Sequence, residues 1–155
     1  VVVLGGQLGA VGVVVGEGVL PVLTGDADGH GAVLGDRAHV ELVGAGGFGL
    51  GGILTPTGVG TDVANGKQVI NVDGKDYLLE TALKGDVCLI KGSIVDKLGN
   101  VYYKGTTKNF CPLMAAACKT VIVEAEQVVE PGELAPEQIM TPFNLVDYIV
   151  EGGRL

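Results

Sequence analysis

The strongest constraint on the fold of this 155-residue chain is the uneven distribution of its glycines. Residues 1–66 hold 19 of the 27 glycines, one basic residue (Arg37) and no Lys, whereas residues 67–155 hold the other 8 glycines and 9 of the 10 basic residues. The glycines follow no Gly-X-Y period and lie among apolar residues, which excludes a collagen helix and a flexible linker. We therefore expect a folded domain that begins with buried strands and glycine loops.

Composition and charge limit the functions open to the chain. Hydrophobic residues make up 47%, charged residues 18% and aromatic residues 5%, with no Trp, so the core must consist mainly of Val, Leu, Ile and Ala. The length suits a single domain over residues 1–155. The net charge is −8 and the basic residues are dispersed, which disfavours binding to nucleic acid or to an anionic membrane surface.

Residues 1–23 are mostly apolar, as a membrane segment would be. Gln7, Glu17 and several glycines interrupt this run, and it lacks the basic flank of a signal peptide. We therefore expect a strand followed by a glycine loop here, and a protein that makes no membrane contact.

The cysteines and histidines indicate neither a disulfide framework nor a metal site. Cys88, Cys111 and Cys118 are an odd number without a CxxC pair, and each lies in an apolar stretch. This is typical of reduced core thiols in a cytoplasmic protein. His30 and His39 lack the spacing of metal ligands.

The chain after residue 66 shows a strand, helix, strand pattern. Residues 67–79 alternate apolar and polar around Asp73-Gly74, the dipeptide that favours a type I′ turn, and predict a β-hairpin. Further strands are expected at 86–91, 101–103, 120–124 and 145–150, and a helix at 112–119 with Asn109 as candidate N-cap. This order predicts an α/β fold with an open, mainly parallel sheet flanked by helices.

Residues 45–61, AGGFGLGGILTPTGVGT, form the densest motif. Gly44, Gly46 and Gly49 match the GxGxxG dinucleotide fingerprint, with residues 40–43 as the preceding strand. However, two more glycines and a proline follow where a helix should begin. Two other interpretations are a glycine-rich surface turn and a loop whose backbone N–H groups approach a ligand closely.

A second glycine loop, GGQLG at residues 5–9, directly follows the apolar residues 1–4. In α/β sheets the loops at the carboxyl ends of strands form the ligand crevice. By itself the motif also fits a tight exit from a strand.

The residues that could act as nucleophiles form no complete catalytic set. Ser93 is the only serine and lies outside any GxSxG motif. Glu124, Glu126, Glu130 and Glu133 follow the predicted strand 120–124, and such a cluster is usually a solvated face, with acid or nucleophile chemistry as the minor alternative.

Several motifs occur together in the order seen in one enzyme family. They are residues 45–61, YLLE (77–80), DVCLIK (86–91), DKLGN (96–100), KNFCPLM (108–114) and KTVIVEAE (119–126). This series resembles the A (alpha) subunit of the 3-oxoacid CoA-transferases, in particular the bacterial acetoacetate/butyrate type. The GGQLG loop is similar to the family's Gly-Gly-Phe loop, with Gln7 in place of Phe. Residues 1–44 match only in fragments and are expected to be an incomplete N-terminal part, and Cys111 stands where the family has Asn.

The resemblance implies a ping-pong transfer of CoA between a short-chain acyl-CoA and a free carboxylic or 3-oxo acid. A Glu of the B (beta) subunit, in a Glu-Asn-Gly motif, attacks the thioester and becomes a glutamyl-CoA thioester. This chain has no Glu-Asn-Gly motif, so Glu80, Glu124 and Glu126 are not expected to be nucleophiles and no catalytic residue is expected here. The expected partner is the CoA-transferase beta subunit, in a heterodimer or heterotetramer, with CoA as a substrate and no permanently bound cofactor or metal.

The resemblance also implies which residues wall the acyl and CoA sites. Their backbone N–H groups would stabilise the oxyanion formed on the thioester, and Phe48 and Leu50 would line a short acyl chain. The loop residues are Gly5, Gly6, Gln7, Gly46, Gly47, Phe48 and Gly49. The alternative function is a non-catalytic α/β module that binds a nucleotide or an acyl ligand.

Overall fold

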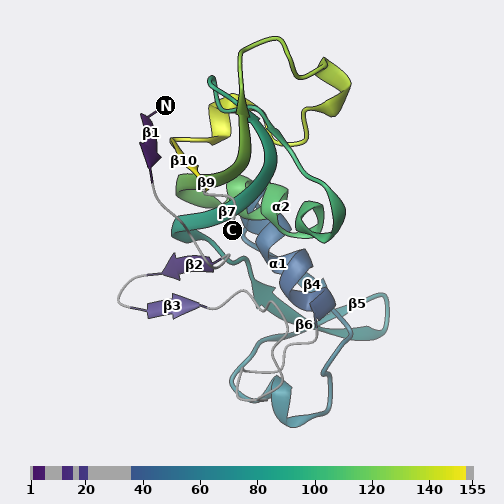
Figure 1. The fold of residues 1–155 in the computed structure, drawn as a ribbon. Helices are drawn as coiled ribbons and strands as arrows, with labels where there is room; N and C mark the ends of the chain where they lie inside the picture. Colours follow the sequence, from purple (N-terminus) through teal and green to yellow (C-terminus); the bar gives the residue numbers. More distant parts are fainter. Residues whose placement is uncertain (1, 6–11, 16–17, 21–35, 153–155) are drawn as a thin grey trace.

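The computed structural model describes residues 2–5, 12–15, 18–20 and 36–152 (Figure 1). Its strands and helices are β1 Val2–Gly5, β2 Gly12–Val15, β3 Gly18–Leu20, α1 Asp36–Gly47, β4 Gly52–Thr55, β5 Val69–Val72, β6 Lys75–Thr81, β7 Gly85–Asp96, β8 Val101–Tyr102, α2 Cys111–Ala117, β9 Cys118–Val129 and β10 Tyr148–Glu151. Short 3₁₀ turns cover Asp62–Ala64, Gly105–Asn109, Pro136–Gln138 and Phe143–Leu145. No helix within the described ranges is long and apolar enough to cross a membrane.

The larger of two sheets has the strand order β1-β10-β9-β7-β2-β3, with β8 also paired to β7. β1, β10, β9 and β7 run parallel to one another, and the pairing of β7 with β9 extends from Gly85 opposite Cys118 to Asp96 opposite Val129. Both of these strands curve strongly (Figure 1). The expected parallel α/β sheet is confirmed for these four strands. β2, β3 and β8 add antiparallel pairs that make the sheet mixed.

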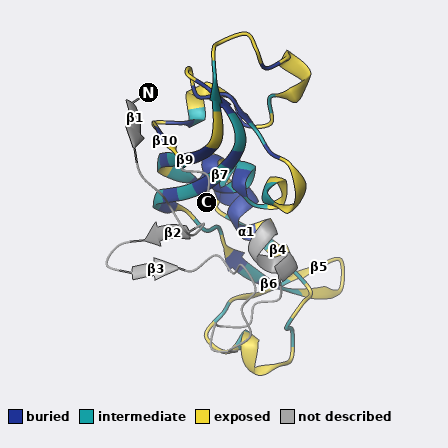
Figure 2. Cartoon of the chain, viewed as in Figure 1, coloured by how far each residue is buried: buried dark blue, intermediate teal, exposed yellow. Residues whose placement is uncertain are grey.

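The hydrophobic core lies between this sheet and α2, where the buried residues gather in Figure 2. Ile90 of β7 and Val123 of β9 are paired across the two strands, so their side chains lie on the same face of the sheet. Both are fully buried and belong to the same core cluster as Met114 of α2. Tyr103 is buried beside them, and its hydroxyl is 2.8 Å from that of Thr141. The core thus forms on one face of the sheet.

The predicted helix and strands form with shifted ends. α2 begins one residue early, at Cys111, and the residues expected as its last turn, 118–119, already belong to β9. Asn109 is not the N-cap, because it ends the preceding 3₁₀ turn and Phe110 occupies the cap without a side-chain hydrogen bond. β9 continues to Val129 because β7 offers partners along its full length.

The smaller sheet contains the expected hairpin. β5 and β6 pair antiparallel across Asp73 and Gly74, whose φ angles of 52° and 81° are both positive, as a type I′ turn requires. β4 pairs with the other edge of β6 and completes a three-stranded sheet that was not expected. Helix α1, also unexpected, contacts α2 at the larger sheet and β4 in the smaller one (Figure 1).

The DKLGN motif is a structural turn between β7 and β8. The side-chain Oδ1 of Asp96 accepts hydrogen bonds from the N–H groups of Leu98, Gly99 and Asn100 at 2.9–3.0 Å. Asn100 donates from its Nδ2 to the other carboxylate oxygen at 2.8 Å and accepts from the N–H of Phe143 at 3.0 Å. The motif therefore fixes the segment that leads to β10 to the end of β7.

Candidate functional site

The glycine-rich segment after α1 closes this helix with a hydrogen-bonded cap. The N–H groups of residues 48–50 all donate to carbonyls of α1, including Gly49 to Gly46 at 3.2 Å and Leu50 to Ala45 at 2.9 Å. These two bonds define a Schellman motif, in which the residue after the helix takes a positive φ. Gly49 has a φ of 75°, so glycine suits this position for its backbone alone.

The dinucleotide-binding interpretation of this segment is wrong. It required a strand at residues 40–43 and a helix that begins near Gly49, where the helix dipole would meet a pyrophosphate. The structure has the reverse order, because α1 includes residues 40–43 and ends at Gly47, and the next regular element is β4. The N–H groups at Gly49 and Leu50 are used in the cap.

Gly46 and Gly47 are packing positions. A Cβ on Gly46 would lie 1.9 Å from the carbonyl oxygen of Leu83, and one on Gly47 would lie 2.8 Å from the Cβ of Ala116 in α2. Real Cβ atoms do not approach other atoms this closely, so these glycines allow α1 to pack against α2 and against the chain before β7. The side chains of this segment that are free to contact a ligand are Phe48 and Leu50, which are 79% and 52% exposed.

The first glycine loop is only partly described. Gly5 ends β1 on the larger sheet, opposite Glu151 of β10, whereas residues 46–49 form the end of α1, which packs on α2, and its cap. Gly6 and Gln7 lie outside the described residues. The meeting of the two glycine loops at one site therefore stays a prediction.

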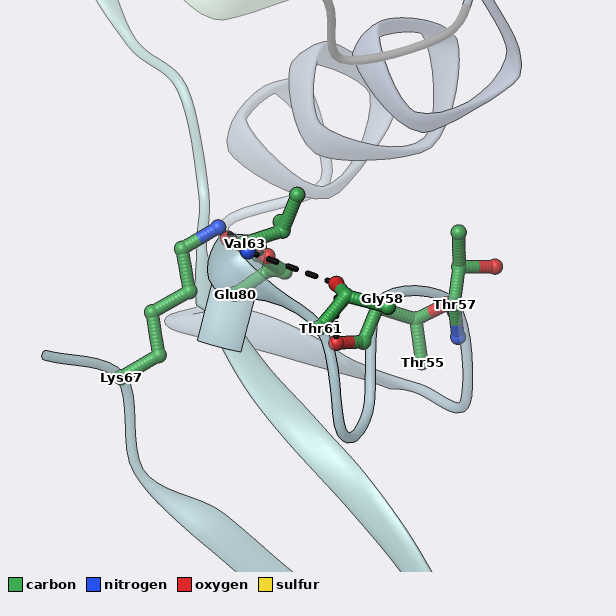
Figure 3. A network of polar contacts seen from close by, with 7 residues as sticks. All are labelled: Thr55, Thr57, Gly58, Thr61, Val63, Lys67 and Glu80. Carbon is green, nitrogen blue, oxygen red and sulfur yellow. Dashed lines mark hydrogen bonds and ion pairs between the residues drawn. The ribbon is translucent and has the colours of Figure 1, made fainter. Parts of the chain in front are cut away.

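Glu80 of the YLLE motif belongs to a structural network in the smaller sheet (Figure 3). Its side chain is 10% exposed and forms an ion pair with Lys67, with 2.5 Å between Nζ and Oε1. The loop between β4 and β5 is held nearby by Thr61, whose hydroxyl donates to the carbonyl of Gly58 at 2.8 Å and accepts from the N–H of Val63 at 3.3 Å. Glu80 thus has a structural partner in Lys67, and its expected lack of a nucleophilic role stays a prediction.

The glutamates around the end of β9 do not form one solvated face. Glu126 is exposed and pairs with Lys91 at 3.3 Å, and Glu130 is exposed and pairs with Lys97. Glu124 differs because it is only 7% exposed. No hydrogen bond or ion pair joins Glu124 to the rest of the described chain. The sequence missed this burial, although Glu124 is the last residue of the strand predicted at 120–124.

Cys88, Cys111 and Cys118 carry free thiols near one another in the core. The hydrogen bond between Cys88 and Cys118, together with burial, raises the pKa of the Cys88 thiol. The same hydrogen bond lowers the pKa of Cys118, whereas burial raises the pKa of Cys111.

Other predicted chemistry is limited in the same way. Ser93 lies within β7, where its hydroxyl oxygen accepts a hydrogen bond from the N–H of Lys104 at 3.0 Å. The described residues contain no group of three or more His, Cys, Asp or Glu side chains arranged to hold a metal ion. The side chains of His30 and His39 are outside what the structure describes. The described part of the chain therefore offers packing and binding surface rather than a self-contained catalytic set.

The family model for coenzyme A transferases matches residues 32–152, which covers α1, β4–β10 and α2. The chain belongs to the coenzyme A transferase family. This confirms the resemblance seen in the sequence.

The curated CoA-transferase relatives include alpha subunits. The chain is 59% identical over 112 residues to the acetoacetyl-CoA:acetate/butyrate CoA transferase alpha subunit of Clostridium acetobutylicum, a match that covers 72% of this chain and 51% of that protein. It is 48% identical over 111 residues to the acetate CoA-transferase subunit alpha of Escherichia coli K12, covering 72% and 50%. The chain therefore spans about half the length of the curated relatives it matches.

Solved structures support the same fold. The glutaconate CoA-transferase of Acidaminococcus fermentans superposes with a TM-score of 0.69 over 75% of this chain and 44% of that chain, at 17% identity. An acyl-CoA transferase of E. coli O157:H7, solved as its thioester complex with CoA, superposes with a TM-score of 0.66 over 76% and 27%, at 20% identity. At these identities the likeness shows the fold alone.

Proposed function

We propose that this chain is the alpha-subunit part of a hetero-oligomeric enzyme that transfers CoA between a short-chain acyl-CoA and a free carboxylic or 3-oxo acid. The observation that carries the proposal is the family match over residues 32–152, together with 59% identity to a subunit whose name gives acetoacetyl-CoA, acetate and butyrate as reactants. CoA serves as a substrate, and the reaction requires no resident cofactor. A cytoplasmic location fits the three free thiols.

The proposed reaction follows a ping-pong route on a glutamate of the beta subunit. That carboxylate attacks the thioester and forms an acyl-glutamyl anhydride with release of the CoA thiolate. The thiolate then attacks the glutamyl carbonyl, which expels the first acid and leaves a glutamyl-CoA thioester, and the incoming acid reverses these steps. In each step a carboxylate or thiolate attacks an acyl carbon and another carboxylate or thiolate leaves it. The reaction therefore involves no change of oxidation state and needs no oxidant.

The role proposed for this chain is to wall the acyl and CoA sites. The absence of a Glu-Asn-Gly motif from the sequence supports a nucleophile on the partner. The exposed Phe48 and Leu50 side chains support an apolar wall for a short acyl group. The proposed loop residues remain Gly5, Gly6, Gln7, Gly46, Gly47 and Gly49. Of these, Gly46 and Gly47 belong to α1, and their proposed role is to place the side chain of Phe48.

Reconstitution tests this function. The native protein that carries this chain is expected to show no CoA transfer from acetoacetyl-CoA or butyryl-CoA to acetate by itself, and to gain transfer when the beta subunit is added in equimolar amount. Ligand binding by the chain alone, with no transfer after addition of the beta subunit, would favour the alternative of a non-catalytic binding module.

A further inference from the structure

Glu124 is the one described carboxylate that is both buried and without a polar partner. The other two buried carboxylates are satisfied, Glu80 by Lys67 and Asp96 by the turn that follows it. Lys91 lies directly opposite Glu124 in the sheet, but its ammonium group pairs with Glu126. Burial of an unpaired carboxylate costs several kcal/mol, so a residue in this state indicates a missing hydrogen-bond donor.

The carboxylate of Glu124 lies on the face of the sheet opposite the core and is nearly, but not fully, enclosed. Its neighbours Val123 and Ala125 face the core, so Glu124 points to the opposite face of the sheet. Within the described residues, no fully enclosed side-chain oxygen or nitrogen lacks a hydrogen-bond partner. Because Glu124 has no partner there, its carboxylate must reach the surface on the face away from α2.

Glu124 lies level with the carboxyl ends of β1 and β10, whereas β7 and β9 continue beyond it to Asp96 and Val129. Glu124 is paired with Val150 of β10, which is in turn paired with Leu4, one residue before β1 ends at Gly5. In parallel sheets this edge is where ligands bind. Two residues earlier, Leu89, Ile122 and Tyr148 form a partly exposed, largely apolar row on the same face.

The charges of the proposed reaction restrict what can approach Glu124. The acid substrates, the phosphates of CoA and the glutamate of the beta subunit are all anionic, and a carboxylate repels them. The pantetheine arm of CoA is neutral and extended, and it carries two amide N–H donors. A neutral chain with such donors can lie along the partly exposed row of Leu89, Ile122 and Tyr148 and donate to the buried carboxylate beyond it.

We propose that Glu124 is a substrate-positioning residue whose carboxylate accepts a hydrogen bond from an amide N–H of the pantetheine arm of acyl-CoA. This inference rests on the proposed function, because it takes CoA as the substrate. It assigns Glu124 no part in bond making or breaking. Its effect is to hold the thioester in register with the nucleophile of the beta subunit.

The test compares Glu124→Leu with Glu126→Leu in the enzyme reconstituted with the beta subunit. Glu126 is the matched control because it lies two residues further on the same strand and face and is exposed.

In Glu124→Leu, loss of a hydrogen bond to a charged acceptor is expected to lower kcat/KM for acyl-CoA at least about tenfold. The value for the acid acceptor should not change, because CoA is already covalently bound when the acid enters. Glu126→Leu should alter neither value.

Two further measurements separate positioning from structural damage. Glu124→Gln keeps a carbonyl oxygen as acceptor and should recover part of the loss seen with Glu124→Leu. With a butyryl thioester of a simple alkanethiol, which has no amide, Glu124→Leu and the unsubstituted enzyme should give the same kcat/KM.

Each other outcome overturns the inference. Unchanged kcat/KM for acyl-CoA in Glu124→Leu excludes the hydrogen bond, and an equal fall for both substrates and for the alkanethiol ester indicates a structural role. Loss of assembly with the beta subunit on size-exclusion chromatography would show that Glu124 pairs with a donor of the partner instead. Failure of the proposed function is distinguishable, because the unsubstituted reconstituted enzyme would then show no CoA transfer.

Discussion

Gly46 is a described position with almost no room for a side chain, because a Cβ there would lie 1.9 Å from the carbonyl oxygen of Leu83. In Gly46→Ala the new Cβ would have to displace the backbone of Leu83, whereas a gain in helix propensity would return only about 1 kcal/mol. We expect Gly46→Ala to lower the free energy of unfolding by about 3 kcal/mol or more. Denaturant unfolding followed by circular dichroism measures this, with Gly51→Ala as control, since nothing lies within 4 Å of a Cβ there. Equal stability of the two variants would contradict the close packing.

The three thiols should differ sharply in reactivity. Cys88 and Cys111 are buried, and their raised pKa values keep them protonated, whereas Cys118 is half-buried and its pKa is lowered. Iodoacetamide at pH 8 should therefore label Cys118 first in the native protein, as read by peptide mass mapping. Under denaturing, non-reducing conditions all three thiols should titrate. A count of one would show a disulfide and contradict the reduced state.

At the scale of elements, the ion pair of Lys67 with Glu80 ties the loop before β5 to β6. Lys67→Met leaves the nearly buried carboxylate of Glu80 without its counter-ion. We expect a loss of about 2 kcal/mol in the free energy of unfolding, less than for a fully buried pair because 28% of the Lys67 side chain is exposed. The double variant Lys67→Met/Glu80→Leu should recover part of this loss.

The control for this pair is Lys97→Met, which breaks the exposed pair with Glu130 and should leave the denaturant midpoint unchanged. If Lys67→Met behaved like Lys97→Met, Glu80 would have to be solvated in solution.

The elements that the sequence predicted well are those whose signal is local. The hairpin at 67–79 is specified by Asp73-Gly74, and the helix at 112–119 by a run of helix formers, so both are present with small shifts. α1 was missed because its glycines disfavour a helix, and contacts with α2 and β4 stabilise it instead. The extension of β9 to Val129 likewise depends on pairing with β7, which no local pattern encodes.

The candidate site was predicted only in part for the same reason. The sequence singled out residues 45–61 and left a surface turn and a ligand-contacting loop as interpretations, whereas the close approach of α1 to Leu83 and Ala116 appears only in three dimensions. Glu124 was placed in a solvated cluster, because its burial depends on β7 and β10 on either side of β9. Residue type and spacing do not carry this information.

At the scale of the whole molecule, the larger sheet carries the hydrophobic core on one face and charged side chains on the other. α2 and the core residues cover one face, whereas Lys91 and Glu126 lie on the other with their side chains in contact with solvent. The chain belongs to the coenzyme A transferase family and spans about half the length of the relatives it matches. The proposal that a beta subunit supplies the nucleophile therefore concerns the rest of the enzyme and is tested on the reconstituted complex.

The most direct test of this account locates the covalent intermediate. The reconstituted enzyme is incubated with acetoacetyl-CoA without acid acceptor, quenched in acid, and the intact mass of each subunit is measured. We predict a CoA adduct on the beta subunit and none on this chain, and the same distribution in Glu80→Gln and Glu126→Gln. A CoA adduct on this chain would place the nucleophile here and contradict the proposed division of labour.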